Sequence, residues 1–387
     1  MIKKEYFKRS LALHKKTKGK ICISSKFPLE NKDDLSLAYT PGVAEVSRYV
    51  AKHRGAAFDY TLKSNSVAVI SDGSAVLGLG DIGPEGALPV MEGKAILFKK
   101  FAGIDAYPIC LATKDVEEII RTIKIISVGF GGINLEDISA PRCFAIEDRL
   151  KKELSIPVMH DDQHGTAIVV LAALINAFRV VRKDMRTARF VVNGAGAAAT
   201  AIVNLMMRFG VPGAHISVLD SRGIIYRRRP DLDMHKKALS LKTNGGKIRG
   251  GLKEALRGAD VFIGVSKGNV LIPEWVDTMA DDPVVFAMAN PYPEISIERA
   301  RNTKIKIFGT GRSDYPNQIN NVLAFPGIFR GALDARARGI TDTMKLAAAR
   351  ALANLISKKA LSEHCIIPDA FDPRVVPEVA RAVKKAI

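Results

Sequence analysis

Four carboxylates in two short segments are the side chains best suited to bind a divalent cation. Glu136 and Asp137 follow the glycine-rich segment GFGGIN, and Asp161 and Asp162 precede an apolar helix that we expect to begin at Gly165. Carboxylate oxygens of this kind suit Mg²⁺ or Mn²⁺. From spacing alone, a metal site competes on equal terms with a set of surface acids and helix caps.

Zinc is a poor candidate for the same region. His160 and His164 lie four residues apart, as in zinc-binding helices, but Asp161 stands where such helices require glutamate. The four cysteines contain no Cys-x-x-Cys pair. This spacing argues against a thiolate zinc site and against a disulfide framework.

A second kind of chemistry is indicated by the segment GAGAAA, which follows the apolar run RFVV. Gly194 permits a tight turn, Gly196 lets a pyrophosphate approach the backbone, and Ala199 allows close packing of helix on strand. Asp220 closes the next apolar run, where an acid would meet the ribose. We therefore predict a dinucleotide-binding unit, the alternative being a turn of the same shape without a ligand.

Another segment matches the same glycine pattern more literally. Gly78, Gly80 and Gly83 form G-x-G-x-x-G, but Pro84 and Gly86 follow where a dinucleotide-binding unit needs a continuous helix. We interpret this segment as a structural or substrate-side loop.

The elements that position these residues alternate between apolar runs and helical patterns. This alternation is typical of a parallel sheet with helices on both faces. We expect strands at 67–70, 189–192, 215–220, 260–265, 284–290 and 304–310, and helices at 115–126, 165–181, 197–209 and 343–361. The predicted fold is α/β. An N-terminal α/β substrate and metal domain (1–158) precedes a Rossmann-type, doubly wound nucleotide-binding domain with C-terminal helices (159–387).

The chain is strongly basic, with 58 Lys and Arg against 40 Asp and Glu and a formal net charge of +18. Such a field attracts anions, including nucleic acid. The basic residues are spread along the chain without a nucleic-acid module, so a solvated basic surface is the simpler interpretation. No apolar run reaches the roughly 18 residues of a membrane-spanning helix, and the start lacks the apolar stretch of a secretory signal. We expect a cytoplasmic protein without nucleic-acid or membrane partners.

Seven segments together resemble malic enzyme, in its short prokaryotic form. They are YTPGVAEV (39–46), LGLGDIGPEGALPVMEGKAILFK (77–99), GGINLEDI (131–138), HDDQHGTA (160–167), NGAGAAA (193–199), FAMANPYPE (286–294) and TGRSDYPNQINNVLAFPGIFRGALD (310–334). The resemblance covers about residues 35–360. It implies oxidation of L-malate by NAD⁺ or NADP⁺ and decarboxylation to pyruvate and CO₂ with a divalent cation. It also implies a homodimer or a dimer-based oligomer.

The same resemblance implies roles for the proton-transferring residues. Lys94 matches the general base that removes the C2 hydroxyl proton, and we expect desolvation or a nearby Mg²⁺ to lower its pKa. Tyr39 matches the general acid that protonates C3 of the enolate. Asp161 matches a carboxylate that hydrogen-bonds the lysine. Without the resemblance, Lys94 would be interpreted as a surface lysine and Tyr39 as a half-buried core residue.

Binding roles follow from the resemblance in the same way. The implied metal ligands are Glu136, Asp137 and Asp162, and the implied cofactor contacts are Thr166, Gly194, Gly196, Ala199, Asp220 and Asn290. Asn290 and Asn321 match residues that hold the substrate carboxylates and the nicotinamide side, with turn chemistry as the alternative. Larger malic enzymes carry a substrate-clamping arginine before LGLG, where this sequence reads Ser74-Ala75-Val76. We expect carboxylate recognition from elsewhere, such as Arg312 or a partner subunit.

The sequence gives two opposed indications of whether NAD⁺ or NADP⁺ binds. Asp220 favours NAD⁺, because a carboxylate accepts hydrogen bonds from a ribose 2′-OH and repels a 2′-phosphate. Arg222 and the arginines at 227–229 match a phosphate, although we interpret those at 227–229 as solvated surface. We predict NAD(P)⁺ with a preference for NAD⁺. Two other functions stay open: another NAD(P)-dependent hydroxyacid or amino-acid dehydrogenase, and a basic nucleic-acid-binding protein on a Rossmann-like scaffold.

Overall fold

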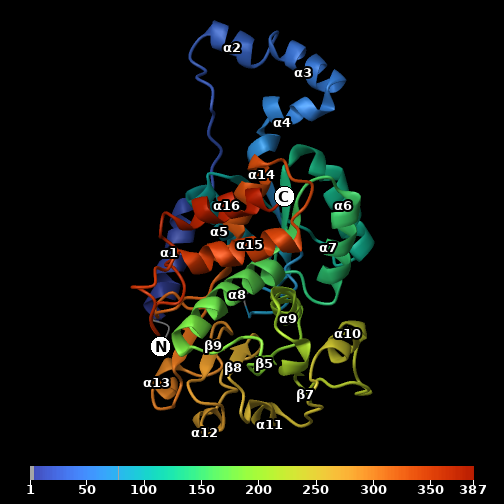
Figure 1. The fold of residues 1–387 in the computed structure, drawn as a ribbon. Helices are drawn as coiled ribbons and strands as arrows, with labels where there is room; N and C mark the ends of the chain where they lie inside the picture. Colours follow the sequence, from blue (N-terminus) through green and yellow to red (C-terminus); the bar gives the residue numbers. More distant parts are fainter. Residues whose placement is uncertain (1–3, 77) are drawn as a thin grey trace.

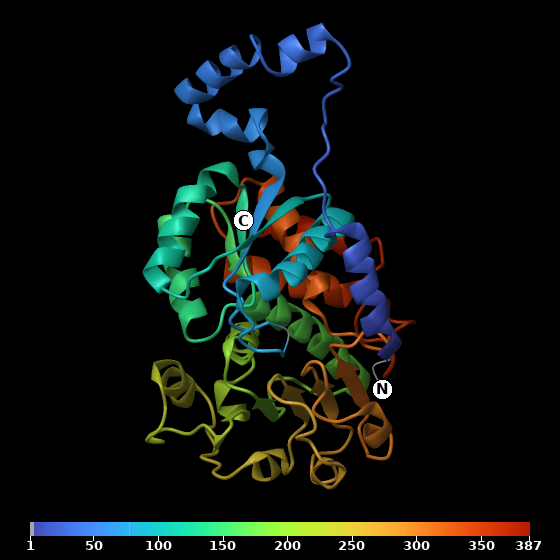
Figure 2. The same cartoon turned by 180° about the vertical axis from the view of Figure 1, so that it is seen from behind.

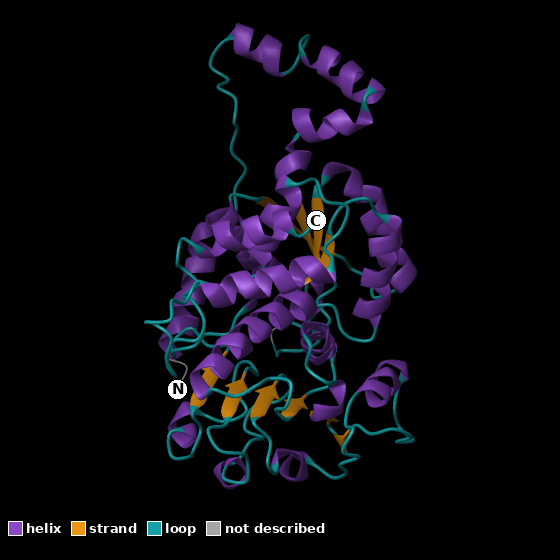
Figure 3. Cartoon of the chain, in the orientation of Figure 1, coloured by secondary structure: helices purple, strands orange, loops and turns teal. Residues whose placement is uncertain are grey.

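Two sheets, one in each half of the chain, organise the protein (Figures 1 and 3). The computed structural model describes residues 4–76 and 78–387; Leu77, the first residue of the LGLG segment, lies outside this part of the chain. The first sheet is parallel, in the order β2-β1-β3-β4. The second has the order β10-β9-β8-β5-β6-β7 and is parallel except for the short β7. The predicted α/β class is confirmed.

The first sheet is covered on both faces, which explains the continuous apolar sequence of its central strand. In β1, Val67 and Val69 enter the core that α5 shares, whereas Ala68 and Ile70 enter the core formed with α6 and α7. The bounds are β1 (Ser66–Ser71), β2 (Asp105–Cys110), β3 (Gly132–Leu135), β4 (Val158–His160), α5 (Gly83–Ala102), α6 (Val116–Ile126) and α7 (Arg142–Glu153).

The second sheet is the predicted doubly wound unit. In β5, Phe190 and Val192 face the core of α8 and α9, and Val191 faces the core of α11 and α12. Its strands are β5 (Phe190–Asn193), β6 (Ile216–Asp220), β7 (Gly223–Ile224), β8 (Val261–Gly264), β9 (Val284–Ala287) and β10 (Ile307–Thr310). Its helices are α8 (Asp161–Val181), α9 (Ala197–Phe209), α10 (Met234–Lys242), α11 (Leu252–Leu256), α12 (Pro273–Val276) and α13 (Ile297–Ala300).

Two predicted helix limits are wrong. Helix α8 begins at Asp161 and not at Gly165, because β4 leads straight into it and acidic residues are favourable in a first helical turn. Helix α15 (Asp342–Asn354) ends earlier than residue 361. There the Ser357 carbonyl accepts hydrogen bonds from the backbone N–H groups of Ala360 and Leu361, which forms a turn in place of further helix.

The C-terminal helices join the two halves of the chain. Helix α14 (Phe325–Asp334) packs against α5 and α16 (Val375–Lys385), and α15 packs against α8. The ring of Phe325 lies 4.6 Å from that of Phe98 on α5. The boundary at 158–159 therefore stays a prediction, since one hydrophobic core extends across it.

Helix α8 is the one described helix that is long and apolar enough to cross a bilayer. Most of it is buried in the protein, where it packs against α9 and α15. Its apolar character is thus accounted for by packing inside the protein.

The segment of residues 21–62, which we call the arm, projects from the body of the protein (Figures 1 and 2). It contains α2 (Lys32–Ala38), α3 (Val43–Lys52) and α4 (Ala57–Tyr60) and follows α1 (Lys4–Thr17), which lies along the body. No residue of the arm is buried.

Candidate active site

A buried lysine held between two carboxylates forms the centre of the candidate site. Nζ of Lys94 lies 2.6 Å from Oδ2 of Asp161 and 2.8 Å from Oε1 of Glu136. It also lies 4.2 Å from the centre of the Phe325 ring. Lys94 is only 7% exposed, so the alternative interpretation as a surface lysine is wrong.

Neighbouring parallel strands bring the two carboxylates together. Glu136 directly follows β3 and Asp161 directly follows β4, and these strands pair with Leu135 opposite His160. Polar residues at the carboxyl ends of adjacent parallel strands meet at one edge of the sheet. Lys94 reaches this edge from the middle of α5, which packs on β1 and β2.

The charge of Lys94 is set by its partners. Burial lowers the pKa of Lys94, but the negative charges and hydrogen bonds of Asp161 and Glu136 outweigh burial and raise it above its ordinary value. The expectation that the pKa of Lys94 lies below its ordinary value is therefore wrong. A base at this position requires that the proton first pass to a neighbouring group.

The carboxylates of the site are costly to ionise together. Burial raises the pKa of Glu136 and of Asp161 to about 7, and that of Asp162 to about 6. In addition, Oδ1 of Asp161 is buried and has no hydrogen-bond partner among the described residues. A bound cation stabilises buried carboxylate oxygens that lack hydrogen-bond partners.

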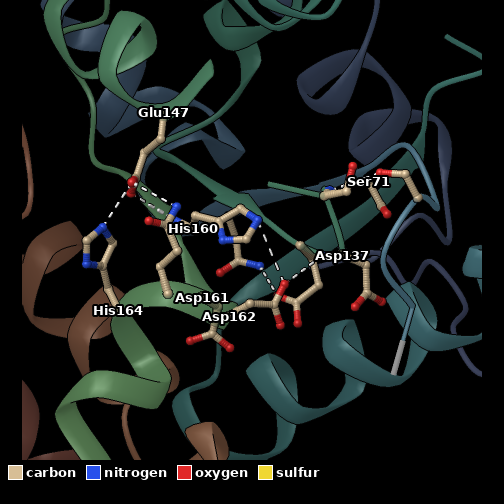
Figure 4. A network of polar contacts seen from close by, with 12 residues as sticks. Ser71, Asp137, Glu147, His160, Asp161, Asp162 and His164 are labelled. Carbon is tan, nitrogen blue, oxygen red and sulfur yellow. Dashed lines mark hydrogen bonds and ion pairs between the residues drawn. The ribbon is translucent and has the colours of Figure 1, made fainter. Parts of the chain in front are cut away.

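The three predicted metal ligands, Glu136, Asp137 and Asp162, lie at this edge of the sheet. The backbone N–H of Asp137 donates a hydrogen bond of 2.8 Å to Oδ2 of Asp162 (Figure 4). In residues 4–76 and 78–387, no three His, Cys, Asp or Glu side chains already surround a common point. The three side chains offer the oxygen donors that Mg²⁺ or Mn²⁺ prefers, and their role as ligands stays a prediction.

Glu147 on α7 anchors the start of α8, a role that the sequence did not reveal (Figure 4). It accepts hydrogen bonds from the backbone N–H of His160 at 2.9 Å, and its other oxygen lies 2.9 Å from Nε2 of His164. Lys151 forms an ion pair with it at 2.7 Å. Burial lowers the pKa of His164 to about 4, so this histidine is neutral and structural at pH 7. The HDDQH segment is therefore held in place by a buried acid.

Asn321 lies beside Asp161, next to the glycine of the HDDQHG segment. A Cβ placed on Gly165 would lie 1.8 Å from Oδ1 of Asp161 and 3.1 Å from Cβ of Asn321. This residue, predicted to hold the substrate, is therefore adjacent to the Lys94 cluster. Asn290 is exposed and follows β9 in the second half of the chain.

The loop with the second glycine pattern meets Asn290. A Cβ on Gly78 would lie 2.1 Å from the backbone oxygen of Asn290, so only glycine fits this contact. The helix that follows is continuous despite Pro84 and Gly86, which corrects our interpretation of these residues; a proline is tolerated in a first helical turn. The loop thus joins the substrate side to the second half of the chain.

A hollow of about 890 Å³ opens at the carboxyl ends of β5 and β6, where a dinucleotide is expected. Gly194, Gly196 and Asp220 line it, and Gly196 caps α9. Ala199 is buried in α9, as expected for close packing, whereas Thr166 is half-buried on α8 outside this lining.

Asp220 is held by basic side chains. Both oxygens of its carboxylate accept hydrogen bonds from the guanidinium of Arg229, and Nζ of Lys236 lies 3.2 Å away. Burial raises the pKa of Asp220, but these bonds outweigh burial and lower it. Arg229 is only 7% exposed and is also paired with Asp231 at 2.8 Å. Interpreting residue 229 as solvated surface was therefore wrong, because two acids outside the arginine run enclose it.

Tyr39 does not join the Lys94 cluster within this chain. It caps the C-terminus of α2 in the arm and is 67% exposed, so it is no half-buried core residue. Arg312 pairs with Asp314 at 2.6 Å.

Arg142, which the sequence did not single out, binds Asp72 at 2.8 Å and the Ser74 hydroxyl at 2.8 Å. The loop at residues 74–76, which lacks the arginine of larger malic enzymes, is thus supported by Arg142.

Comparison with known proteins matches both halves of the chain to one family. Residues 18–151 match the family described as malic enzyme, N-terminal domain, and residues 163–387 match malic enzyme, NAD binding domain. A bifunctional malic/malolactic enzyme of Bacillus subtilis (strain 168) is 55% identical over 378 residues, which cover 97% of this chain and 92% of that protein. The chain belongs to the malic enzyme family.

Two further malic enzymes agree with this assignment. An NAD-dependent malic enzyme of Geobacillus stearothermophilus is 55% identical over 368 residues, covering 95% of this chain and 76% of the relative. The crystal structure of an NAD-dependent malic enzyme from Thermotoga maritima superposes with a TM-score of 0.93 at 49% identity, covering 97% of this chain and 99% of that one. The resemblance on which the sequence interpretation rested is confirmed.

Proposed function

We propose that the cluster of Lys94, Asp161 and Glu136 is where this malic enzyme oxidises L-malate with NAD(P)⁺ and decarboxylates the product to pyruvate and CO₂. The observation that carries the proposal is the buried lysine, 2.6 Å from one carboxylate and 2.8 Å from another, at the edge of the first sheet. Family membership favours this reaction over the other dehydrogenase and nucleic-acid-binding functions that the sequence left open.

Lys94 is the base for the C2 hydroxyl of malate. Its proton passes first to Oδ2 of Asp161, which accepts its hydrogen bond, and the neutral amine then takes the hydroxyl proton as C2 becomes a carbonyl. When bound in the hollow lined by Gly194 and Gly196, NAD(P)⁺ would supply the hydride acceptor for C2, and a divalent cation held by Glu136, Asp137 and Asp162 would supply a Lewis acid for the C2 oxygen.

Tyr39 is the acid for the last step. The electron pair of the C2–C3 double bond forms the new C3–H bond with the proton of the phenol, and the C2 oxygen becomes the carbonyl of pyruvate. The phenol is restored from water. The exposed hydroxyl on the arm can serve this purpose only when the arm meets a Lys94 cluster.

The ligands proposed for the cation are Glu136, Asp137 and Asp162. Asn321 is proposed to position the substrate, because its side chain adjoins Asp161. Asn290 is proposed to serve both the substrate and the nicotinamide side. The proposed contacts of the cofactor are the glycines of the hollow together with Thr166, Ala199 and Asp220.

The finer properties rest on separate observations. Asp220 at the end of β6 supports a preference for NAD⁺, although Arg229 and Lys236 offset its repulsion of a 2′-phosphate. The four cysteines are free, which supports a reducing compartment and hence the cytoplasm. The uncovered arm supports a homodimer or dimer-based oligomer.

A substrate panel with and without cation tests the proposal. L-malate, other 2-hydroxy acids and amino acids are supplied with either nucleotide, after treatment with EDTA and again with added Mn²⁺. We expect formation of reduced nucleotide and pyruvate from L-malate with Mn²⁺, and loss of both in EDTA. Faster turnover of another hydroxy acid or an amino acid, or full activity in EDTA, would contradict the proposal.

A further inference from the structure

Five helices line a second cavity, of about 640 Å³, which is separate from the Lys94 cluster. Its walls belong to α7, α8, α9, α10 and α15. Among the described residues, it has Phe144 and His235 in common with the lining of the nucleotide hollow and no others. A cavity of this volume suits a small-molecule ligand. The proposed reaction of malate makes no use of it.

The lining of this cavity includes a buried lysine whose counter-charge is weak. Lys345 of α15 is only 6% exposed, and its Nζ lies 3.2 Å from Oδ1 of Asp342 on the same helix. Asp342 is exposed and also pairs with Arg208 of α9 at 3.4 Å. Water screens an ion pair with an exposed partner, whereas a buried charge needs close compensation. The ammonium group of Lys345 is therefore poorly compensated.

A second lysine in the lining adds to the cost of this charge. Burial lowers the pKa of Lys345, and the positive charge of Lys151 on α7 lowers it further. The negative charges of Glu147 and Asp342 act in the opposite direction, but they do not restore the ordinary value. An anion that contacts both lysines would relieve their repulsion.

The carboxylates of the lining leave little negative charge for these lysines. Glu147 is buried, and its oxygens already meet the backbone N–H of His160 and the imidazole of His164, both at 2.9 Å (Figure 4). The other two acids of the lining, Asp148 and Asp342, are exposed, so water and salt screen them. Four Lys or Arg residues line the cavity against three Asp or Glu residues. The cavity therefore attracts an anion.

A hydroxyl group in the same lining lacks a partner. Oγ1 of Thr200 on α9 is buried and makes no hydrogen bond within residues 4–76 and 78–387. A buried hydroxyl without a partner costs free energy, which a bound acceptor recovers. Thr200 thus offers a neutral donor to an anion that Lys151 and Lys345 attract.

We propose that this cavity binds a small phosphorylated molecule, whose phosphate group is held by Lys345, Lys151 and the hydroxyl of Thr200. A phosphate group carries about 1.5 to 2 negative charges at pH 7 and three acceptor oxygens, which match two ammonium groups and one hydroxyl. Lysine binds phosphate as a point charge, whereas a carboxylate brings a single negative charge. The site is distinct from the nucleotide hollow and needs neither Lys94 nor the proposed cation ligands.

Equilibrium dialysis with labelled inorganic phosphate tests the proposal. NADH at saturating concentration fills the nucleotide hollow, and EDTA removes divalent cations, so that neither place contributes to the binding of phosphate. We expect the wild type to bind one phosphate per chain. Lys345→Met removes the buried charge and should weaken this binding about 10-fold or more, the effect of losing a hydrogen bond to a charged group.

Three further measurements separate this effect from general charge and from folding. Lys237→Met loses the same charge at an exposed position that lines neither the cavity nor the hollow, and it should bind phosphate as the wild type does. Thr200→Val is nearly isosteric and should weaken binding several-fold through loss of the hydroxyl alone. The urea midpoint of Lys345→Met should be no lower than that of the wild type, because the substitution removes a costly buried charge.

Three results would overturn the proposal. The first is a wild type that binds no phosphate, or none once NADH is present, since phosphate would then occupy only the hollow. The second is equal binding by the wild type, Lys345→Met and Thr200→Val. The third is succinate displacing labelled phosphate at a lower concentration than unlabelled phosphate does, which would assign the cavity to carboxylates. Dialysis needs no turnover, so failure of the malate assignment would leave these results unchanged.

Discussion

The carboxylate of Asp161 occupies the space that a side chain at Gly165 would need. A Cβ on Gly165 would lie 1.8 Å from Oδ1 of Asp161, whose other oxygen accepts the hydrogen bond of Lys94 at 2.6 Å. The two residues are one helical turn apart at the start of α8. The orientation of the carboxylate towards the lysine therefore depends on the absence of a side chain four residues later.

Gly165→Ala should displace Asp161 and separate it from Lys94. We expect kcat for malate oxidation to fall by roughly 10²-fold or more, since small misplacements of catalytic groups have effects of this size. Overpacking should also lower the free energy of unfolding by about 1–3 kcal/mol. Gly93→Ala on α5 is the matched control, because a Cβ there meets no atom within 4 Å. Equal kcat in the two variants would show that the carboxylate's position is unimportant.

Lys94→Ala and Tyr39→Phe should separate the two halves of the reaction. The first variant lacks the base for the hydroxyl proton and should lose malate oxidation by about 10²–10⁴-fold. The second should lose mainly the tautomerisation of enolpyruvate, measured as exchange of the methyl protons of pyruvate with solvent by NMR. A parallel loss of both activities in both variants would rule out separate roles.

Lys236→Ala should sharpen the preference for NAD⁺. Nζ of Lys236 lies 3.2 Å from Asp220 in the lining of the hollow, where it would attract a 2′-phosphate. We expect kcat/KM to fall several-fold for NADP⁺ and to change little for NAD⁺. The exposed neighbour Lys237 does not line the hollow, and Lys237→Ala is the control. An equal fall for both nucleotides would show that Lys236 does not distinguish them.

The strands of the second half could be predicted because they are buried on both faces. In β5, β6 and β8 to β10, nearly every residue is buried or half-buried, so each strand is a short apolar run closed by small or polar residues. Helix α9 was predicted with its observed limits, since GAGAAA marks its start. The local sequence pattern was sufficient to predict those strands and helices whose limits depend on their own residues.

Contacts between distant residues could not be predicted in this way. Glu147 looks like a surface acid of α7 until the fold places His160 and His164 against it. Arg229 looks solvated within an arginine run, although Asp220 and Asp231 enclose it. Tyr39 was found through its motif, but no motif tells whether an arm meets its own body or another.

Glu294 should make stability depend on pH. This fully buried residue accepts hydrogen bonds from the N–H groups of Ala289 and Ser266, yet burial outweighs them and raises its pKa to about 7. A carboxyl group whose pKa is higher in the folded state than in the unfolded state contributes stability at pH values below its unfolded-state pKa. This contribution is lost as the pH rises through its folded-state pKa. Between pH 5 and pH 8 this loss amounts to roughly 2–3 kcal/mol.

Glu294→Gln removes this dependence, because the amide stays neutral. Urea unfolding of both proteins at pH 5 and pH 8 measures the effect. Relative to the wild type, the free energy of unfolding of the variant should increase by roughly 2–3 kcal/mol from pH 5 to pH 8. A difference that does not change with pH would mean that Glu294 is ionised throughout.

The product balance of a single reaction tests the proposed activity of the Lys94 site most directly. Wild-type protein is incubated with L-malate, NAD⁺ and Mn²⁺, and NADH, pyruvate and oxaloacetate are quantified together over time. We expect pyruvate and NADH to form in equal amounts without accumulation of oxaloacetate, and we expect Lys94→Ala to form neither. Oxaloacetate accumulating in step with NADH would contradict the proposed activity, because the site would then oxidise malate without decarboxylating the product.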